Sequence, residues 1–297
     1  MSTVPPSSST PRAIGLFSTL TSNGSRTIVG DVLDAVASGA LGPIEVAFVF
    51  VNRAAGESAV TDESVRQLEA RGVRVVRASA VAFERDARKA ARAAAKAGDE
   101  TAMWAWRDRF YASYREQLPA TDLDLLLGDM WIWGAVQCAE RRGVNLHPSL
   151  PSGPLGKMWF DVVWDLIAGG AEESGVMLHR VTPAVDRGPI VSWCRYGLRT
   201  PALAPLWDGL PPQGPGREAL VAAERALKRD SRHPLFHAVR AAGFARETPL
   251  MLQTVRAVAE GRLRLAEGRV LDGDGRPLAQ GLDLSAPVED MVARGTS

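Results

Sequence analysis

The sequence predicts an α/β fold in which a doubly wound, mostly parallel sheet carries helices on both faces. Short apolar runs rich in β-branched and aromatic residues, such as Val46-Ala47-Phe48-Val49, alternate over the first 150 residues with stretches of helical spacing. The connections between them are short, which is typical of βαβ units in a parallel sheet.

Each element is predicted from its own pattern. We expect strands at residues 13–17, 45–51, 73–76, 122–127 and 144–147, and helices at 28–36, 63–70, 85–97, 106–118 and 135–142. Gly143 is predicted to close the last of these helices in a left-handed turn. Further on, we expect helices at 217–228 and 248–260 and a β-hairpin at 269–278 that turns at 272–275.

The predicted domain organisation has three parts. Residues 1–12 are rich in Ser, Pro and Thr and are expected to form a disordered tail. They lack the basic segment followed by an apolar segment that marks a signal peptide. Residues 13–200 are expected to form the α/β domain. Residues 201–297 are expected to add an insertion, helices and the hairpin, packed on the same domain as a C-terminal appendage.

Composition limits the classes of function. With 297 residues and 46% hydrophobic residues the chain can bury a core, and two cysteines are too few for a disulfide framework or a zinc site. A net charge of +1 gives no strong electrostatic attraction to nucleic acid or to an anionic membrane surface. No apolar run is long enough to span a bilayer. We therefore expect a cytoplasmic protein that acts on small molecules without a metal.

The first loop is a candidate anion site. It includes Gly24, Ser25 and Arg26 between the first strand and the first helix, an arrangement that directs free backbone N–H groups at an anion. On local grounds alone, an ordinary helix cap is the favoured interpretation of such a loop.

Asn145 and His147 are the centre of the predicted site. They end an apolar run, and because strand side chains repeat with period two they share one face. Pro148 then stops the strand, so both side chains are expected at the carboxyl-terminal edge of the sheet, where open α/β sheets bind ligands. An imidazole supplies a general acid or base near neutral pH, and an amide can donate a hydrogen bond to a developing oxyanion.

Asp186 is the candidate carboxylate that completes this set. It lies about forty residues later, in the predicted turn Val185-Asp186-Arg187-Gly188-Pro189. A carboxylate can fix the tautomer of an imidazole. These three side chains favour group transfer onto an amine. The other three histidines, His179, His233 and His237, are expected to be structural.

A loop with large apolar side chains follows the fourth predicted strand. It contains Met130, Trp131, Ile132 and Trp133. At the exit of a central strand, such residues are as consistent with the wall of a small-molecule pocket as with core packing.

The segments Asn145-Leu146-His147-Pro148-Ser149-Leu150-Pro151 and Asp186-Arg187-Gly188-Pro189 resemble the signature of the folate-dependent formyltransferases, most closely the phosphoribosylglycinamide (GAR) formyltransferases. The resemblance implies a Rossmann-like formyltransferase fold, an N-formyltransferase activity and 10-formyltetrahydrofolate as co-substrate. It implies that Asn145 binds the formyl oxygen, that His147 is the acid/base and that Asp186 assists proton transfer. The folate would be bound by Arg85, Met130, Trp131, Ile132, Trp133, Thr182 and Val185, and an acceptor phosphate by Gly24, Ser25 and Arg26.

The chain also departs from that signature. The family's usual Leu-Leu-Pro is replaced by Leu150-Pro151-Ser152-Gly153, and extra residues occur around 95–106 and 201–216. The resemblance therefore predicts the formyl-transfer reaction better than it predicts the identity of the acceptor. The acceptor could be GAR, as in purine biosynthesis, or an amino sugar or another amine of specialised metabolism.

Three other functions are compatible with the same residues. A 10-formyltetrahydrofolate hydrolase (deformylase) would use the same set with water as acceptor, and it ranks second because it usually carries an extra N-terminal regulatory domain. Formylation of initiator tRNA ranks lower because the chain lacks a basic C-terminal domain. A non-catalytic folate-binding relative is disfavoured because a buried Asn, His and Asp set costs stability unless it is used or fully hydrogen-bonded.

Overall fold

The computed structural model describes residues 11–128, 130 and 132–295, and these form two compact units. The first unit extends to Gly143 and includes Val255–Glu267 and Asp272–Gly275. The second contains Val144–Thr254, Gly268–Leu271 and the chain from Arg276 onward. The predicted tail falls mostly outside the described residues, and the predicted division at residue 200 stays a prediction.

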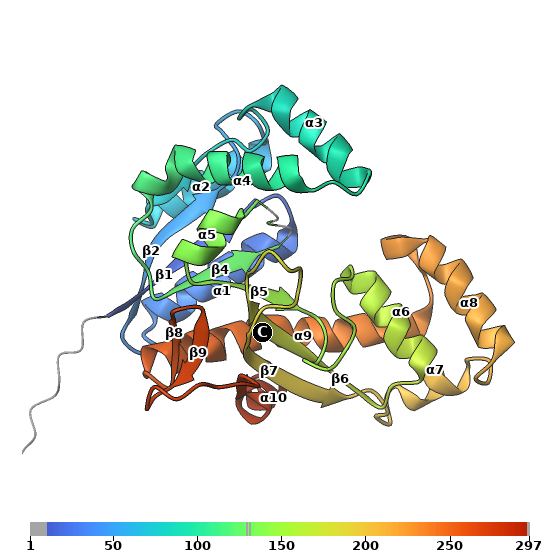
Figure 1. The fold of residues 1–297 in the computed structure, drawn as a ribbon. Coiled ribbons are helices and arrows are strands. Elements are labelled where there is room, and N and C mark those ends of the chain that lie inside the picture. Colours follow the sequence, from blue (N-terminus) through green and yellow to red (C-terminus); the bar gives the residue numbers. More distant parts are fainter. Residues whose placement is uncertain (1–10, 129, 131, 296–297) are drawn as a thin grey trace, which may run out of the picture. The chain divides into compact units, whose positions relative to one another are not determined.

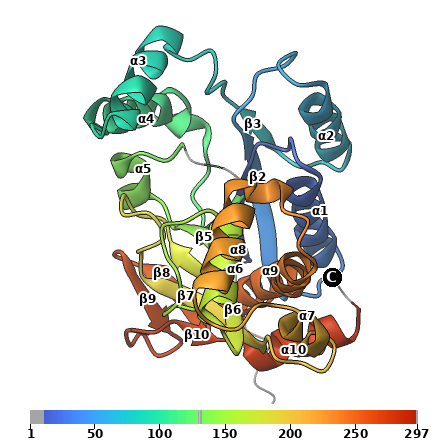
Figure 2. The same ribbon diagram turned by 90° about the vertical axis from the view of Figure 1, so that its right-hand side faces the viewer.

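The first unit is a parallel sheet between two layers of helices (Figure 1). Its strands are β1 (Arg12–Ser18), β2 (Ile44–Val51), β3 (Val75–Arg77) and β4 (Leu123–Leu127), paired in the order β4-β1-β2-β3. Its helices are α1 (Asn23–Ala37), α2 (Ala59–Ala70), α3 (Arg85–Lys96), α4 (Thr101–Tyr114) and α5 (Ala135–Glu140), and α4 is followed by the 3-10 turn η1 (Arg115–Gln117). Figure 2 shows α1 and α2 on one side of these strands and α4 and α5 on the other.

Two kinds of contact hold this sheet in place. The rings of Phe17, Phe50 and Tyr114 form a continuous aromatic cluster, with centroids 5.3 Å apart for the first pair and 4.3 Å for the second. The second contact is an ion pair, in which the fully buried Asp124 accepts hydrogen bonds from Arg141 at 2.7 and 2.9 Å. A buried carboxylate is stable only when it is paired and hydrogen-bonded, so this ion pair fixes the end of α5 against β4.

The second unit contains antiparallel strands and its own helices. Its strands are β5 (Gly143–His147), β6 (Glu173–Arg180), β7 (Ile190–Gly197) and β10 (Leu282–Asp283). β5 pairs antiparallel with β6 and β6 with β7, whereas β10 runs parallel to β7. Its helices are α6 (Trp159–Gly169), α7 (Ala204–Asp208), α8 (Pro215–Ala226) and α10 (Ser285–Ala293), with the 3-10 turn η2 (Lys228–Asp230) after α8.

The predicted α/β class with a mostly parallel sheet is confirmed, because β1–β2, β1–β4, β2–β3 and β7–β10 are parallel and two pairs are antiparallel. The C-terminal appendage is confirmed as well. β8 (Leu263–Ala266) and β9 (Arg269–Asp272) form a two-stranded sheet. The hairpin predicted at 269–278 is present in a short form, as an antiparallel bridge between Leu271 and Pro277.

One predicted helix is much longer than expected. The sequence predicts a helix at 248–260. In the structure α9 runs from Pro234 to Ala259, with Pro249 inside it. It contributes residues up to Thr254 to the second unit and the rest to the first. In the second unit the ring of Phe236 stacks on that of Trp164 at 5.2 Å, and this tertiary packing favours the longer helix.

The prediction for Gly143 is wrong. Its backbone is not in the left-handed region, and it is the first residue of β5 instead of the end of a helix. The glycine is required for space, because a Cβ placed on it would lie 2.3 Å from the Trp133 ring.

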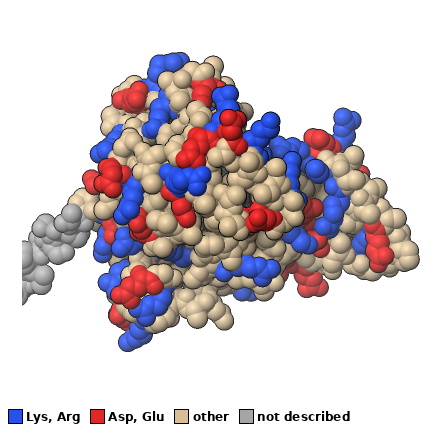
Figure 3. All heavy atoms as spheres, turned by 45° about the horizontal axis from the view of Figure 1, so that its top comes forward, with Lys and Arg blue, Asp and Glu red and all other residues tan. Residues whose placement is uncertain are grey.

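The described residues contain no helix that is long and apolar enough to cross a membrane. The face in Figure 3 carries Lys and Arg side chains intermingled with Asp and Glu, in keeping with the net charge of +1.

We predict that Gly143→Ala destabilises the protein by about 1–3 kcal/mol, because the added methyl group has to displace the Trp133 indole. The midpoint of urea unfolding measures this change. Gly30→Ala is the control, since a Cβ at Gly30 in α1 meets no atom within 4 Å and alanine is the better helix former. A Gly143→Ala protein as stable as the wild type would contradict the packing argument.

Candidate active site

Asn145 and His147 lie on β5 as the period-two pattern predicts. In the antiparallel pairing with β6, Asn145 is opposite His179 and His147 is opposite Met177. His147 is 3% exposed, whereas Asn145 is half-buried. The Asn145 side chain makes no hydrogen bond within the part of the chain that the structure describes, so its amide is free to bind a ligand.

Asp186 meets His147 in the second unit. Its Oδ2 atom lies 3.3 Å from Nδ1 of His147 and accepts a hydrogen bond of 3.2 Å from the Gly156 backbone N–H. Asp186 is 5% exposed and has a left-handed backbone with φ of 52°. Asp tolerates this conformation better than most residues do.

The turn that carries Asp186 is held closed at its ends. The Arg180 backbone N–H donates to the Pro189 carbonyl at 2.8 Å, and Arg187 N–H donates to the Ala184 carbonyl at 3.2 Å. Gly188 packs so closely on the Arg180 carbonyl that a Cβ would lie 1.9 Å from its oxygen. The glycine of Asp186-Arg187-Gly188-Pro189 is therefore required for this close approach.

His179 is a member of the site that sequence reasoning missed. Its Nε2 atom lies 3.3 Å from Oδ1 of Asp186, and its Nδ1 atom lies 3.0 Å from the Arg180 carbonyl. The side chain is 3% exposed. A single histidine outside the two motifs gives no sequence signal for this contact. The one available clue is its position seven residues before Asp186, because His179 lies on β6 and Asp186 lies in the turn that follows β6.

The hydrogen-bond acceptors around His147 outnumber the protons of a neutral imidazole. Nε2 lies 2.7 Å from the Pro154 carbonyl, and Nδ1 faces the Asp186 carboxylate. A neutral imidazole carries one N–H group and can satisfy only one of these acceptors, whereas the imidazolium satisfies both. The surroundings of His147 are thus arranged to receive a proton.

Burial disfavours the protonated form of His147. It lowers the pKa of His147 below the ordinary histidine value, and the Pro154 carbonyl and Asp186 only partly offset this effect. For Asp186, burial alone would raise the pKa, but His179, His147 and the Gly156 N–H outweigh it and hold the pKa below its usual range. Asp186 therefore stays ionised near neutral pH beside an imidazole that is ready to act as a base.

The loop after β5 positions the partners of His147. Ser149 is fully buried, and its hydroxyl donates to the carbonyls of Leu150 at 2.9 Å and Pro154 at 3.3 Å. Gly153 N–H donates to the Leu150 carbonyl at 2.8 Å. This loop brings the Pro154 carbonyl onto His147 and the Gly156 N–H onto Asp186.

The first loop forms the N-terminus of α1. The Ser22 hydroxyl caps the helix by accepting from the Ser25 N–H at 3.1 Å, and Ser25 is 4% exposed. Gly24 has open space where a Cβ would be. The half-buried Arg26 donates to the Thr21 carbonyl at 3.1 Å and to the Asn23 side chain, so its guanidinium is held beside the loop.

The residues predicted to bind folate have different surroundings. Met130, Ile132 and Trp133 are buried, and the Trp133 ring packs edge-on against Phe17 with centroids 5.0 Å apart. Trp131 lies outside the described residues. Arg85 is exposed at the start of α3. In the second unit, Val185 is 39% exposed and the Thr182 hydroxyl donates to the Ala184 carbonyl at 3.0 Å.

Among residues 11–128, 130 and 132–295, no group of three or more His, Cys, Asp or Glu side chains is arranged to hold a metal ion.

Comparison with solved structures shows that the chain has the fold of the folate-dependent formyltransferases. The phosphoribosylglycinamide formyltransferase of Coxiella burnetii matches with a TM-score of 0.56 and 19% identity, over 92% of this chain and 99% of that one. The glycinamide ribonucleotide transformylase 1 of Symbiobacterium toebii matches with a TM-score of 0.51 and 23% identity, over 88% and 93%. The formyltetrahydrofolate deformylase of Pseudomonas syringae pv. tomato matches with a TM-score of 0.52 and 15% identity, over 89% and 66%. By sequence, no family model and no curated protein matches the chain.

We predict that Asp186→Asn lowers the pKa of His147 further. The carboxylate favours the charged imidazolium, so its removal leaves burial less opposed. Asparagine tolerates the left-handed backbone at this position, so the fold should be kept. NMR titration of isotope-labelled histidine measures the His147 midpoint in both proteins. A midpoint above that of the wild type would refute the electrostatic role of Asp186.

Proposed function

We propose that this protein is an N-formyltransferase that moves the formyl group of 10-formyltetrahydrofolate to an amine of a small-molecule acceptor. The main support is the arrangement in the second unit, where β5 carries Asn145 and His147 and the turn after β6 brings Asp186 to 3.3 Å from the imidazole. The fold that this chain shares with formyltransferases supports the same chemistry.

The residues present fit the co-substrate. The Asn145 amide has no protein partner among the described residues, as expected for a group that binds a substrate oxygen. Met130, Ile132 and Trp133 are apolar, as the residues around a planar ring usually are, and they are buried in this structure. They are proposed to contact the folate together with Arg85, Trp131, Thr182 and Val185. When bound, 10-formyltetrahydrofolate supplies a formyl group activated for transfer.

Asn145 is proposed to stabilise developing charge. Its side-chain N–H groups would donate to the formyl oxygen, which gains negative charge as the amine approaches the carbon. A donor carried by a strand of the sheet can stabilise that charge with less reorganisation than water requires.

His147 is proposed to take the proton that the amine loses on attack and to return it to the leaving nitrogen. Its lowered pKa leaves it neutral at pH 7, which a base requires. Once protonated, it gains Asp186 as an ionic partner. Nε2 is engaged by the Pro154 carbonyl in this structure, so proton transfer at Nε2 requires the loop from Leu150 to Gly156 to release that bond.

The acceptor is proposed to carry an anionic group. Gly24, Ser25 and Arg26 place a helix N-terminus and a guanidinium together, and both favour a phosphate or a similar anion. This fits GAR, and with it purine biosynthesis, and it also fits a phosphorylated amino sugar or another anionic amine of specialised metabolism.

Hydrolysis of 10-formyltetrahydrofolate is the second candidate, favoured by the fold match to a formyltetrahydrofolate deformylase. The same three residues would serve with water as acceptor. Incubation with the co-substrate, with and without a panel of amines, separates the two functions. A formylated amine detected by mass spectrometry supports transfer, whereas formate released at the same rate without any amine supports hydrolysis.

We predict that Asn145→Ala lowers kcat by about 10²–10³-fold through loss of the oxyanion donor. His147→Ala is expected to lower kcat by about 10²–10⁴-fold through loss of the acid/base. Steady-state release of tetrahydrofolate measures both effects, with circular dichroism to verify folding.

His237→Ala is the matched control, because His237 is exposed on α9 and no role is proposed for it. It should retain wild-type kcat. Full activity of His147→Ala would show that the acid/base assignment is wrong.

A further inference from the structure

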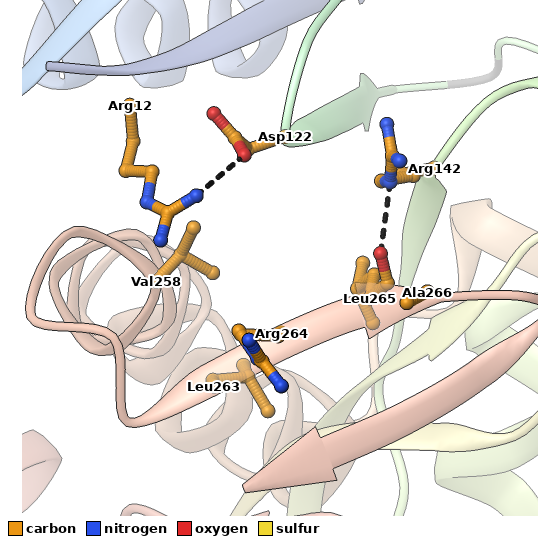
Figure 4. Close-up of a pocket in the computed structure, with 8 residues that line it drawn as sticks. All are labelled: Arg12, Asp122, Arg142, Val258, Leu263, Arg264, Leu265 and Ala266. Atoms are coloured by element: carbon orange, nitrogen blue, oxygen red, sulfur yellow. Dashed lines mark hydrogen bonds and ion pairs between the residues drawn. The ribbon is translucent and has the colours of Figure 1, made fainter. Parts of the chain in front are cut away.

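The first unit contains a hollow that the proposed reaction does not use. Its volume is about 230 Å³ (Figure 4). It is lined by Arg12, Asp122, Arg142, Val258, Leu263, Arg264, Leu265 and Ala266. Three of these eight residues are arginines and one is acidic.

This hollow lies at the amino-terminal edge of the parallel strands. Arg12 is the first residue of β1, Asp122 immediately precedes β4, and Ile14 of β1 pairs with Leu123 of β4. The Gly24–Arg26 loop follows the opposite end of β1. Seven strand residues at about 3.3 Å each separate the two ends by roughly 23 Å. The hollow is therefore distinct from the proposed acceptor-anion loop.

The charges around the hollow are unbalanced. Arg12 is paired with Asp122 at 3.1 Å. Arg142 donates to the carbonyls of Leu265 and Thr121, both at 2.8 Å, and these are neutral acceptors. Arg264 makes no hydrogen bond or ion pair with any residue that the structure describes. Two positive charges are thus left without a carboxylate, and the backbone bonds hold one of them in place.

The rest of the lining is apolar. Leu263 is fully buried, and Val258 and Leu265 are 4% and 5% exposed. Figure 4 shows these side chains and the arginines around one open space. A ligand that matches both parts of the lining combines two negative charges with a compact apolar body.

We propose that this hollow binds a small dianion that carries an apolar ring, with Arg142 and Arg264 binding the acidic groups and Val258, Leu265 and Ala266 contacting the ring. An apolar cavity of about 150 Å³ can bind benzene, so this volume has room for one ring with its acidic groups. Guanidinium groups bind phosphate and carboxylate through the same paired hydrogen bonds. The ligand is therefore an aryl phosphate or an aromatic dicarboxylate.

Calorimetry with phenyl phosphate and with phthalate tests the proposal. Both probes are titrated into an Arg26→Gln protein, so that binding at the first loop does not interfere. We expect at least one probe to bind with one-to-one stoichiometry. Binding of phenyl phosphate alone identifies a phosphate ligand, and binding of phthalate alone identifies a dicarboxylate. Absence of binding by both probes overturns the proposal.

Variants then place the bound probe. Arg264→Gln should weaken binding at least tenfold, because it removes a charge that has no structural partner. Ala266→Trp should do the same by filling the hollow while keeping every arginine. Arg66→Gln is the control, because this exposed arginine lies on α2, forms an ion pair with Glu63 and does not line the hollow. Affinity unchanged in both Arg264→Gln and Ala266→Trp overturns the proposal.

Discussion

The buried Asp186 carboxylate is the interaction on which the site depends. It stands between two imidazoles, 3.3 Å from each, and the Gly156 N–H binds it from the adjacent loop. An ionised carboxylate in such a buried place is costly unless its oxygens are engaged. These contacts join strand β5, strand β6 and the loop from Leu150 to Gly156, and β5 also carries Asn145.

The same arrangement bears on the role proposed for His147, which is to accept a proton and return it. Burial keeps His147 neutral, and Asp186 with the Pro154 carbonyl offers two acceptors to its charged form. The two tendencies oppose each other and burial is the larger, so the neutral form is favoured near pH 7 while the charged form still has two acceptors beside it. A group that has to change state in each turnover needs such a balance.

Much of the fold and the centre of the site could be predicted from local rules. Period two placed Asn145 and His147 on one face, and the alternation of strands and helices predicted the parallel sheet. What could not be predicted depends on contacts between distant residues. His179 joins the site by its contact with Asp186 and by its place opposite Asn145, and Gly143 is a glycine because the Trp133 ring occupies its space. Pro249 lies inside α9, where the packing of Phe236 on Trp164 extends the helix beyond the predicted start.

The left-handed backbone at Asp186 limits which residues can occupy this position. The φ angle of Asp186 is 52°, and glycine, asparagine and aspartate adopt this backbone conformation at the lowest cost. Of these three, only aspartate supplies the charge that the two histidines share. Glutamate does occur at positive φ in this structure, at Glu84 and Glu267, but its side chain is one methylene longer and would displace the carboxylate from the two imidazoles. Backbone conformation, charge and side-chain length together therefore favour aspartate at this position.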